Sequence, residues 1–432
     1  MSLTLTAIVA LIAMLLLMFV GMPVAYAMLL VGCLGIAYLS SPAAVLNLVC
    51  ADIWSNFSSY NMIVVPLFTF MGTIAFQTGI GERLYNAADK WLGHFRGGLG
   101  FATIVTSALF GAMCGSTTAE VATITKVALP EMEKYGYKRS LSTACIAAAG
   151  SLAILIPPSG NMIIYGVITG ESILQLFVAG VIPGIILTVL FIAVMAIEAR
   201  RPGAAPAAKK YTWKERIRSL SGIIEFVVLV AIVLGGLMVG WFTPSEAGGA
   251  GAAGAIVIAL VRRNLTWKKL MNAVAETTHI SGSIFLIVTA AGVFGHFLAL
   301  TRVPSNLSMW IADLGLPPAA VMAMIIVVYL VGGCFMDALP LITLTVPIFY
   351  PIVTSIGYSG VWFGICIVLI TQMGLITPPV GMNVYVIKSC APQIPINEIF
   401  RGIWTFLIAI IILAVLLLFI PELVYWLPGL LS

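Results

Sequence analysis

The feature that most constrains this 432-residue chain is an internal repeat of two interrupted apolar segments. Residues 98–160 are echoed by residues 315–381, where glycines, acids and prolines recur in the same order. The offset is 217 positions at first and becomes 221 after a four-residue insertion. The matched positions are Gly98 and Gly315, Gly115 and Gly332-Gly333, Glu120 and Asp337, Pro130 and Pro347, Pro157-Pro158 and Pro378-Pro379, and Gly160 and Gly381.

The amino-acid composition indicates that the chain folds in a lipid bilayer. Hydrophobic residues make up 61% of the chain and charged residues only 9%. Residues 3–20, 223–241 and 406–420 form long apolar runs, and a bilayer core of about 30 Å needs about 20 such residues per helix. A water-soluble fold is excluded by this balance. We therefore predict an all-α polytopic membrane protein.

The sequence lacks the residues that transition-metal, nucleotide, catalytic and nucleic-acid-binding sites require. The seven cysteines and three histidines are scattered without metal-ligand spacing, so we expect no transition-metal site. No G-x-x-x-x-G-K-[ST] string is present for a nucleotide, and no convergent catalytic cluster indicates an enzyme. The basic residues lack the exposed aromatics of a nucleic-acid surface. Paired halves with Gly- and Pro-interrupted segments instead indicate a secondary transporter.

Basic loops predict the orientation in the membrane. The longest polar stretch is placed in the cytoplasm by the positive-inside rule, and residues 262–269 lie two crossings later on the same side. Both termini are then expected in the periplasm. The basic residues of the long loop are Arg200, Arg201, Lys209, Lys210, Lys214, Arg216 and Arg218.

The joints around Gly115 and Gly333 are too apolar to be ordinary loops. Unpaired backbone at membrane depth must be buried in protein or line a wet cavity, so we predict two re-entrant helical hairpins. Each hairpin is followed by a helix broken at a Pro-Pro pair. An odd number of crossings separates the two copies, which makes them inverted structural repeats.

Domain limits follow from this pattern. We expect N-terminal scaffold helices in 1–60, the first repeat in 61–200, a cytoplasmic loop with inter-repeat scaffold helices in 201–263, and the second repeat in 264–432. Amphipathic stretches at 44–55, 81–96, 265–279 and 305–314 are expected at the membrane surface.

Five motifs resemble a known family, the large membrane subunit of tripartite ATP-independent periplasmic (TRAP) transporters. The resemblance runs from near Met1 to the C terminus and includes Thr243-Pro244-Ser245-Glu246-Ala247 between the repeats. The motifs are Gly115-Ser116-Thr117-Thr118-Ala119, Ile156-Pro157-Pro158-Ser159, Gly333-Cys334-Phe335-Met336-Asp337, Thr345-Val346-Pro347-Ile348-Phe349 and Gly374-Leu375-Ile376-Thr377-Pro378-Pro379-Val380-Gly381.

This resemblance implies sodium-coupled uptake of a small organic anion, a carboxylate or a sulfonate, by an elevator mechanism. It implies an ion-transporter-superfamily-like fold in the bacterial inner membrane. The implied partners are a periplasmic substrate-binding protein and a small four-helix membrane subunit. Two or more Na⁺ ions are implied as coupling ions.

The resemblance also implies two sodium sites. A broken helix frees carbonyl oxygens that can replace the hydration shell of Na⁺, while the N terminus of the next half-helix favours an anion. The implied second-repeat site comprises Gly333, Asp337, Gly374, Thr377 and Val380. The implied first-repeat site comprises Ser116, Thr117, Ala153, Ile156 and Pro158.

Two residues depart from the family pattern in the first repeat. Ala153 stands where glycine is favoured, and Glu120 where a small residue is more common. An acid within the membrane is a functional hypothesis because charge costs about 2.5–3.5 kcal/mol there. Glu120 is either a specificity residue, a helix N-terminal charge or a structural acid, solvated or paired with Lys126. Asp337 is expected to serve a cation directly.

Substrate contacts are expected from polar groups near the breaks. Arg302 is either a cationic partner of the anion or an interfacial anchor. Hydroxyls in membrane helices often bond their own backbone, so each remains one of several options. The substrate-binding candidates are Thr118, Glu120, Ser159, Asn161, Asn383 and Arg302.

Two alternatives stay open. One is a sodium-coupled anion transporter that works without a binding protein. The other is an ion channel, since re-entrant Gly-rich loops also build selectivity filters. Inverted copies within one chain favour alternating access over a channel. A C4-dicarboxylate, a sugar acid and a small sulfonate all remain open as substrate.

Overall fold

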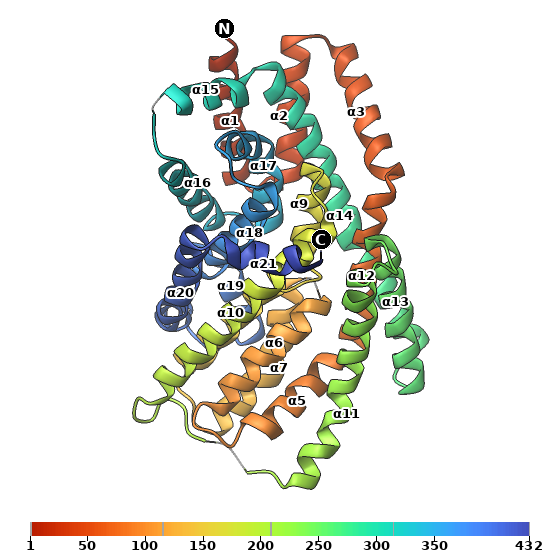
Figure 1. The fold of residues 1–432 in the computed structure, drawn as a ribbon, viewed down its shortest axis with the longest axis vertical. Coiled ribbons are helices and arrows are strands. Elements are labelled where there is room, and N and C mark those ends of the chain that lie inside the picture. The colour runs from red at the N-terminus through yellow and green to blue at the C-terminus, as the bar shows by residue number, and fades with distance from the viewer. Residues whose placement is uncertain (1, 115, 208–209, 314, 432) are drawn as a thin grey trace.

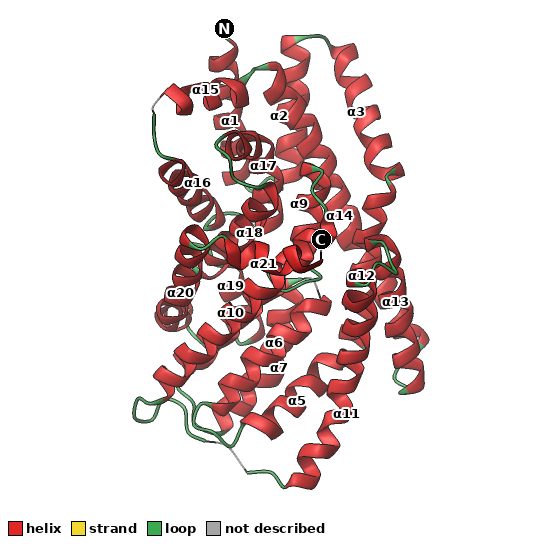
Figure 2. Cartoon of the chain, viewed as in Figure 1, coloured by secondary structure: helices red, strands yellow, loops and turns green. Residues whose placement is uncertain are grey.

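The computed structural model describes residues 2–114, 116–207, 210–313 and 315–431. Gly115 and Lys209, both named above, lie outside the described residues. Within those ranges the chain is helical and holds no β-strand, apart from one isolated bridge between Arg96 and Ala207 (Figure 2). The prediction of an all-α protein is confirmed.

Seven helical stretches of the described chain are long and apolar enough to cross a membrane. Further apolar helices of 10–17 residues occur mainly in the N-terminal region and in the interrupted segments. The polytopic membrane class is thereby supported. The seven are Tyr60–Gln77, Ile173–Ala199, Trp213–Met238, Pro244–Val261, Trp267–Leu300, Ala338–Ser355 and Ile396–Phe419.

Three of the N-terminal helices, α2, α3 and α4, pack on one long helix from the second half of the chain, α14 (Trp267–Leu300). Gly32 and Gly35 let α2 approach it closely, because a Cβ at Gly35 would lie 2.4 Å from the Phe297 ring. Thr73 of α4 bonds Thr277 of α14 at 2.9 Å. The helices are α1 (Leu3–Phe19), α2 (Val24–Leu39), α3 (Pro42–Ser58), the 3₁₀ turn η1 (Tyr60–Ile63), α4 (Val64–Gln77) and α5 (Ile80–Leu92).

The stretch 265–279 does not form a separate surface element, contrary to expectation. It is the first half of α14, since no proline or polar turn divides it from the apolar run that follows. The other three amphipathic stretches become α3, α5 and α15 (Val303–Asp313).

The middle of the chain forms α10 (Ile173–Ala199), a basic loop, and the pair α11 (Trp213–Val230) and α13 (Pro244–Val261), joined through η3 (Ala231–Gly235) and α12 (Gly236–Met238). Capping boxes start both helices of the pair, with Thr212 and Glu215 in α11 and Thr243 and Glu246 in α13. In Figure 1 the N terminus lies at the top of the view and the basic loop at the bottom.

Three charged residues tie this pair to α5. Glu225 of α11 is buried and lies 2.7 Å from Arg83 of α5 and 2.6 Å from Arg262, which follows α13. A buried acid is tolerated here because two cations share it. The contact holds three sequence-distant elements in one body.

The two interrupted segments contain four corresponding helices in the same order, and the first has an additional 3₁₀ turn before its last helix. The first broken segment is α6 (Gly98–Cys114), α7 (Thr117–Lys134), α8 (Arg139–Gly150), the 3₁₀ turn η2 (Ser151–Ile154) and α9 (Gly160–Thr169). The second is α16 (Pro318–Gly333), α17 (Ala338–Ser355), α18 (Gly360–Ile376) and α19 (Met382–Cys390), followed by α20 (Ile396–Phe419) and α21 (Glu422–Leu431). The peptide bonds Pro157-Pro158 and Pro378-Pro379 are both cis.

The broken segments interlock crosswise. The half-helix α9 packs on α17, and α19 packs on α7 and α8. Tyr350 of α17 donates to Glu171 next to α9 at 2.8 Å, and Asn383 of α19 donates to the Ala147 carbonyl of α8 at 2.9 Å. Each half-helix after a break therefore rests on the opposite segment, which brings both breaks into the middle of the molecule.

Candidate functional site

In the second broken segment, the hairpin turn lies directly on the helix break. A Cβ at Gly374 of α18 would lie 2.2 Å from the carbonyl carbon and 2.4 Å from the carbonyl oxygen of Gly333 at the end of α16. A Cβ at Gly333 would in turn lie 3.2 Å from Gly374 Cα. The two backbones touch because neither residue has a side chain. Two residues expected in one site are thus brought together.

The other expected residues of this segment surround the crossing. Thr377, where α18 stops, donates its hydroxyl to the Met373 carbonyl at 2.8 Å and lies 3.3 Å from the Cys334 thiol of the hairpin turn. Asp337 caps α17 and accepts from the Ala338 amide at 2.8 Å. Val380 follows the Pro-Pro pair and is half-buried. Carbonyls at the end of α18, one carboxylate and one hydroxyl therefore lie near a single turn.

The first broken segment has a hydroxyl cap in place of the acid. Ser116 caps α7 by accepting from the Ala119 amide at 3.5 Å, and its hydroxyl lies 3.2 Å from that of Thr118. Thr117 is buried. Gly115, the expected tip glycine, is outside the described residues. The tip residues Ser116 and Thr117 therefore begin a helix whose first turn holds Glu120.

Ala153 and Glu120 meet at Gly111 of α6. A Cβ at Gly111 would lie 2.6 Å from Glu120 Oε2 and 2.8 Å from Ala153 Cα. The hairpin arm thus crosses η2 through a glycine, as in the second segment, but the glycine is on α6 and the broken helix carries alanine. The Glu120 carboxylate sits beside this crossing.

Glu120 is fully buried, and neither of its carboxylate oxygens has a hydrogen-bond partner among the described residues. The buried Ser107 hydroxyl on α6 lies close to the Glu120 carboxylate, and the buried Thr106 hydroxyl has no partner among the described residues. The interpretation of Glu120 as a solvated or Lys126-paired acid is wrong, because Lys126 is exposed and forms no ion pair with it. Burial of an unpaired acid is costly and requires a compensating proton or cation.

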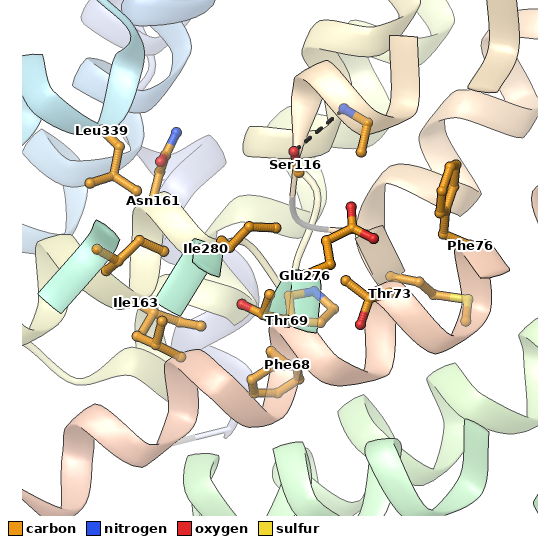
Figure 3. Close-up of a pocket in the computed structure, with 16 residues that line it drawn as sticks. Phe68, Thr69, Thr73, Phe76, Ser116, Asn161, Ile163, Glu276, Ile280 and Leu339 are labelled. Carbon is orange, nitrogen blue, oxygen red and sulfur yellow. Dashed lines mark hydrogen bonds between the residues drawn. The ribbon is translucent and has the colours of Figure 1, made fainter. Parts of the chain in front are cut away.

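A cavity of about 60 Å³ lies where the hairpins meet α4 and α14 (Figure 3). Ser116 and Pro158 line it from the first broken segment, and Leu339 of α17 from the second. Asn161 of α9 faces it and is 94% buried with no hydrogen bond to another described residue. The remaining wall comes from Thr69 and Thr73 of α4 and from α14.

Glu276 of α14 also lines this cavity, and Figure 3 shows its carboxyl near the centre of the view. The sequence reasoning missed it, because it lies in the stretch expected at the membrane surface. It also missed Gln372 of α18, whose amide oxygen and nitrogen are both buried without partners among the described residues. An isolated amide in an otherwise apolar run was the available signal.

Five of the six substrate candidates lie outside the cavity lining, namely Glu120, described above, and four others. Ser159 donates its hydroxyl to the Ile154 carbonyl at 2.6 Å, and Asn383 is held by Ala147, with its own carbonyl oxygen unpaired among the described groups. Thr118 lies on the first turn of α7 beside Ser116. Arg302 is exposed in the turn after α14, with φ of 56°.

The family described as "Tripartite ATP-independent periplasmic transporter, DctM component" matches residues 11–423. The chain belongs to this family. It is therefore a transporter permease subunit of a multi-pass inner-membrane type and not an enzyme.

Two curated relatives span nearly the whole chain. The C4-dicarboxylate TRAP transporter large permease protein DctM of Pseudomonas aeruginosa is 32% identical over 392 residues, covering 90% of this chain and 91% of the relative. The ectoine/5-hydroxyectoine TRAP transporter large permease protein UehC of Ruegeria pomeroyi is 34% identical over 373 residues, covering 86% of each.

A solved structure shares the fold at low identity. The crystal structure of the YdaH transporter of Alcanivorax borkumensis superposes with a TM-score of 0.63 at 13% identity, covering 87% of this chain and 90% of that one. At this identity the similarity concerns the fold alone.

Proposed function

We propose that this permease subunit carries out sodium-coupled uptake of a small organic anion, a carboxylate or a sulfonate, across the bacterial inner membrane. The observation that carries the proposal is a close crossing of a hairpin with a helix break in both broken segments, at Gly333 and Gly374 in the second and at Gly111 and Ala153 in the first. At the crossing of the second segment, backbone atoms at two helix ends meet without side chains between them, and carbonyl oxygens freed at helix ends suit a partly dehydrated Na⁺.

Two sodium ions are assigned to the two crossings. The second would use backbone oxygens of Gly333, Gly374, Thr377 and Val380 and the carboxylate of Asp337. The first would use Ser116 and Thr117 with backbone oxygens of Ala153, Ile156 and Pro158, while Glu120 beneath it supplies the charge. The proximity of Gly333 to Gly374, and of Glu120 to Ala153, supports this assignment.

The cavity between the crossings is the proposed substrate site. The Ser159 hydroxyl donates to the Ile154 carbonyl and does not cap α9, so the first backbone amides of that helix stay available to an anion. Asn161 offers an unpaired amide beside them. Both features support a carboxylate or sulfonate group at the start of α9.

We infer an elevator cycle of inverted repeats. The interlocked broken segments would move as one unit against a frame of α2, α4, α13 and α14. The region limits 1–60, 61–200, 201–263 and 264–432 describe this division, with both termini in the periplasm. The tripartite family supports a periplasmic binding protein and a small four-helix membrane subunit as partners.

Reconstitution in liposomes tests the proposal. The complete complex with its binding protein should take up substrate only with an inward sodium gradient, and more than one Na⁺ should enter per substrate. Matched liposomes with a proton gradient and no sodium serve as the control. Full uptake there would contradict sodium coupling, and bulk ion conductance would instead support a channel.

A further inference from the structure

A basic cavity lies between α8, α20 and the loop after α10. It has a volume of about 230 Å³, and its charged lining residues are Lys138, Arg201, Arg401 and Glu198. Arg201 pairs with Glu198 at 2.8 Å. The side chains of Lys138 and Arg401 form no ion pair or hydrogen bond with other described residues. Two exposed positive charges without a described protein partner therefore line one cavity.

Close backbone packing brings these cations together. A Cβ at Gly402 would lie 2.1 Å from the Ser140 carbonyl oxygen, so α20 crosses the start of α8 at the residue after Arg401. The Lys138 amide donates to the Ala204 carbonyl at 2.9 Å, which fixes the loop after α10 against α8. Lys138 gives α8 no side-chain cap, so the positive end of this helix adds to the cavity's potential.

An apolar groove of about 360 Å³ continues from this cavity between α10 and α20. The two spaces share Glu198 and Thr405 in their linings. Ile197 and Ile408 line the groove and are 62% and 55% exposed, so it opens on the outer surface of the bundle. Figure 1 shows α10 and α20 at the lower left, on the outside of the molecule.

The linings change character in order along the two helices. From Arg201 and Arg401 they pass through Glu198 and Thr405 to Leu190 and Ile412. At a rise of 1.5 Å per residue, α10 covers about 14 Å between its last residue, Ala199, and Leu190. A phosphate-bearing head and the first part of an acyl chain have this length and this order of polarity.

We propose that the paired spaces bind one anionic phospholipid, with its phosphate between Lys138 and Arg401 and an acyl chain in the groove. Charge complementarity selects this occupant, because basic pockets between membrane helices hold anionic head groups. A free phosphate would leave the groove empty. A zwitterionic lipid would bring its own cation toward two unpaired cations.

Lipid binding to the purified full-length subunit with its membrane partner tests the proposal. The probes are short-chain phosphatidylglycerol, short-chain phosphatidylcholine and inorganic phosphate, followed by native mass spectrometry and by melting temperature. Phosphatidylglycerol should bind and raise the melting temperature, and the other two should not. Phosphate acting as strongly as phosphatidylglycerol, or no preference between the lipids, would overturn the proposal.

Two variants locate the site. Lys138→Gln with Arg401→Gln should weaken phosphatidylglycerol binding about fivefold for each cation removed. The matched control, Lys214→Gln with Arg218→Gln on α11, removes two exposed cations elsewhere and should leave binding unchanged. An equal loss in both double variants would reduce the effect to general surface charge and overturn the site.

The groove is tested by Ala193→Trp, which fills it, against Val189→Trp, which faces outward on the same helix beyond the groove lining. Only Ala193→Trp should reduce lipid retention. If Ala193→Trp instead releases the small membrane subunit and keeps its lipid, the groove is a protein interface and the proposal is wrong.

Discussion

Replacing Gly374 by alanine tests the crossing of α16 and α18 directly. The new methyl group would lie 2.2 Å from the Gly333 carbonyl carbon, whereas ordinary contact begins at 3.4 Å. The neighbouring atoms are backbone, so no rotamer change relieves the overlap. The hairpin turn and the break must therefore separate by about 1.2 Å.

Overpacking of this kind costs about 1–3 kcal/mol, and the absence of flexible neighbours puts Gly374→Ala at the upper end of that range. If sodium binds only when the crossing is closed, the same energy appears in ion affinity. The half-saturating sodium concentration for uptake should then rise about fivefold to 150-fold. The melting temperature without sodium should fall as well.

Gly282→Ala is the matched control. It makes the same change in α14, where no other atom lies within 4 Å of the added Cβ, and it should leave uptake unchanged. Sodium dependence is measured as initial uptake rate against external sodium in liposomes. A Gly374→Ala protein with wild-type sodium dependence and stability would refute the close crossing and the ion site built on it.

Three further outcomes are expected. Asp337→Asn should raise the half-saturating sodium concentration about tenfold to hundredfold with little change in melting temperature, since a charged contact is worth about 1.5–3 kcal/mol; unchanged sodium dependence would make Asp337 a structural cap. Glu225→Gln should lower the free energy of unfolding of the α5–α11–α13 body by about 2 kcal/mol. The loss is smaller than for a fully buried pair because Arg83 and Arg262 are 27% and 40% exposed. Glu131→Gln, in an exposed pair, should change the stability little. The purified large subunit alone should not transport, and uptake at the rate of the full complex would contradict the tripartite assignment.

Local signals in the sequence were sufficient to locate the helix breaks. Pro157-Pro158 and Pro378-Pro379 interrupt their helices because proline lacks an amide donor and cannot continue the helix. Gly333 and Gly374 could be proposed as neighbours from the repeat and the family resemblance. Their backbone contact was not derivable, since it depends on how two helices cross.

Tertiary neighbours account for what the sequence did not predict. Nothing in the run around Gly111 indicates that Glu120 and Ala153 meet there, because the three lie on different elements. Glu276 was placed at the surface from local amphipathicity, although α14 continues and carries it into the central cavity. The crosswise packing likewise joins residues far apart in the sequence. The separation is 169–195 positions for α9 and α17 and 248–273 positions for α19 and α7.

The two matched acids sit in different surroundings. Asp337 is the cap residue of α17 and is partly exposed, with an amide at 2.8 Å. Glu120 lies inside the first turn of α7, fully buried and without a partner among the described residues. Glu120 is thus the more deeply buried acid and, in the described part of the chain, the one without a backbone amide at its carboxylate, and this difference gives Glu120→Gln an effect that changes sign with sodium.

Without sodium, Glu120→Gln should melt at a higher temperature than the wild type, because an unpaired charge at membrane depth costs about 2.5–3.5 kcal/mol. With saturating sodium the wild type gains a cation beside the carboxylate, and the advantage of the variant should vanish or reverse. Melting temperatures of both proteins across a sodium titration, with choline to hold ionic strength constant, show whether the order of their stabilities reverses. Parallel curves at every sodium concentration would mean that Glu120 carries a proton throughout, and the first sodium site would then rest on backbone oxygens and hydroxyls alone.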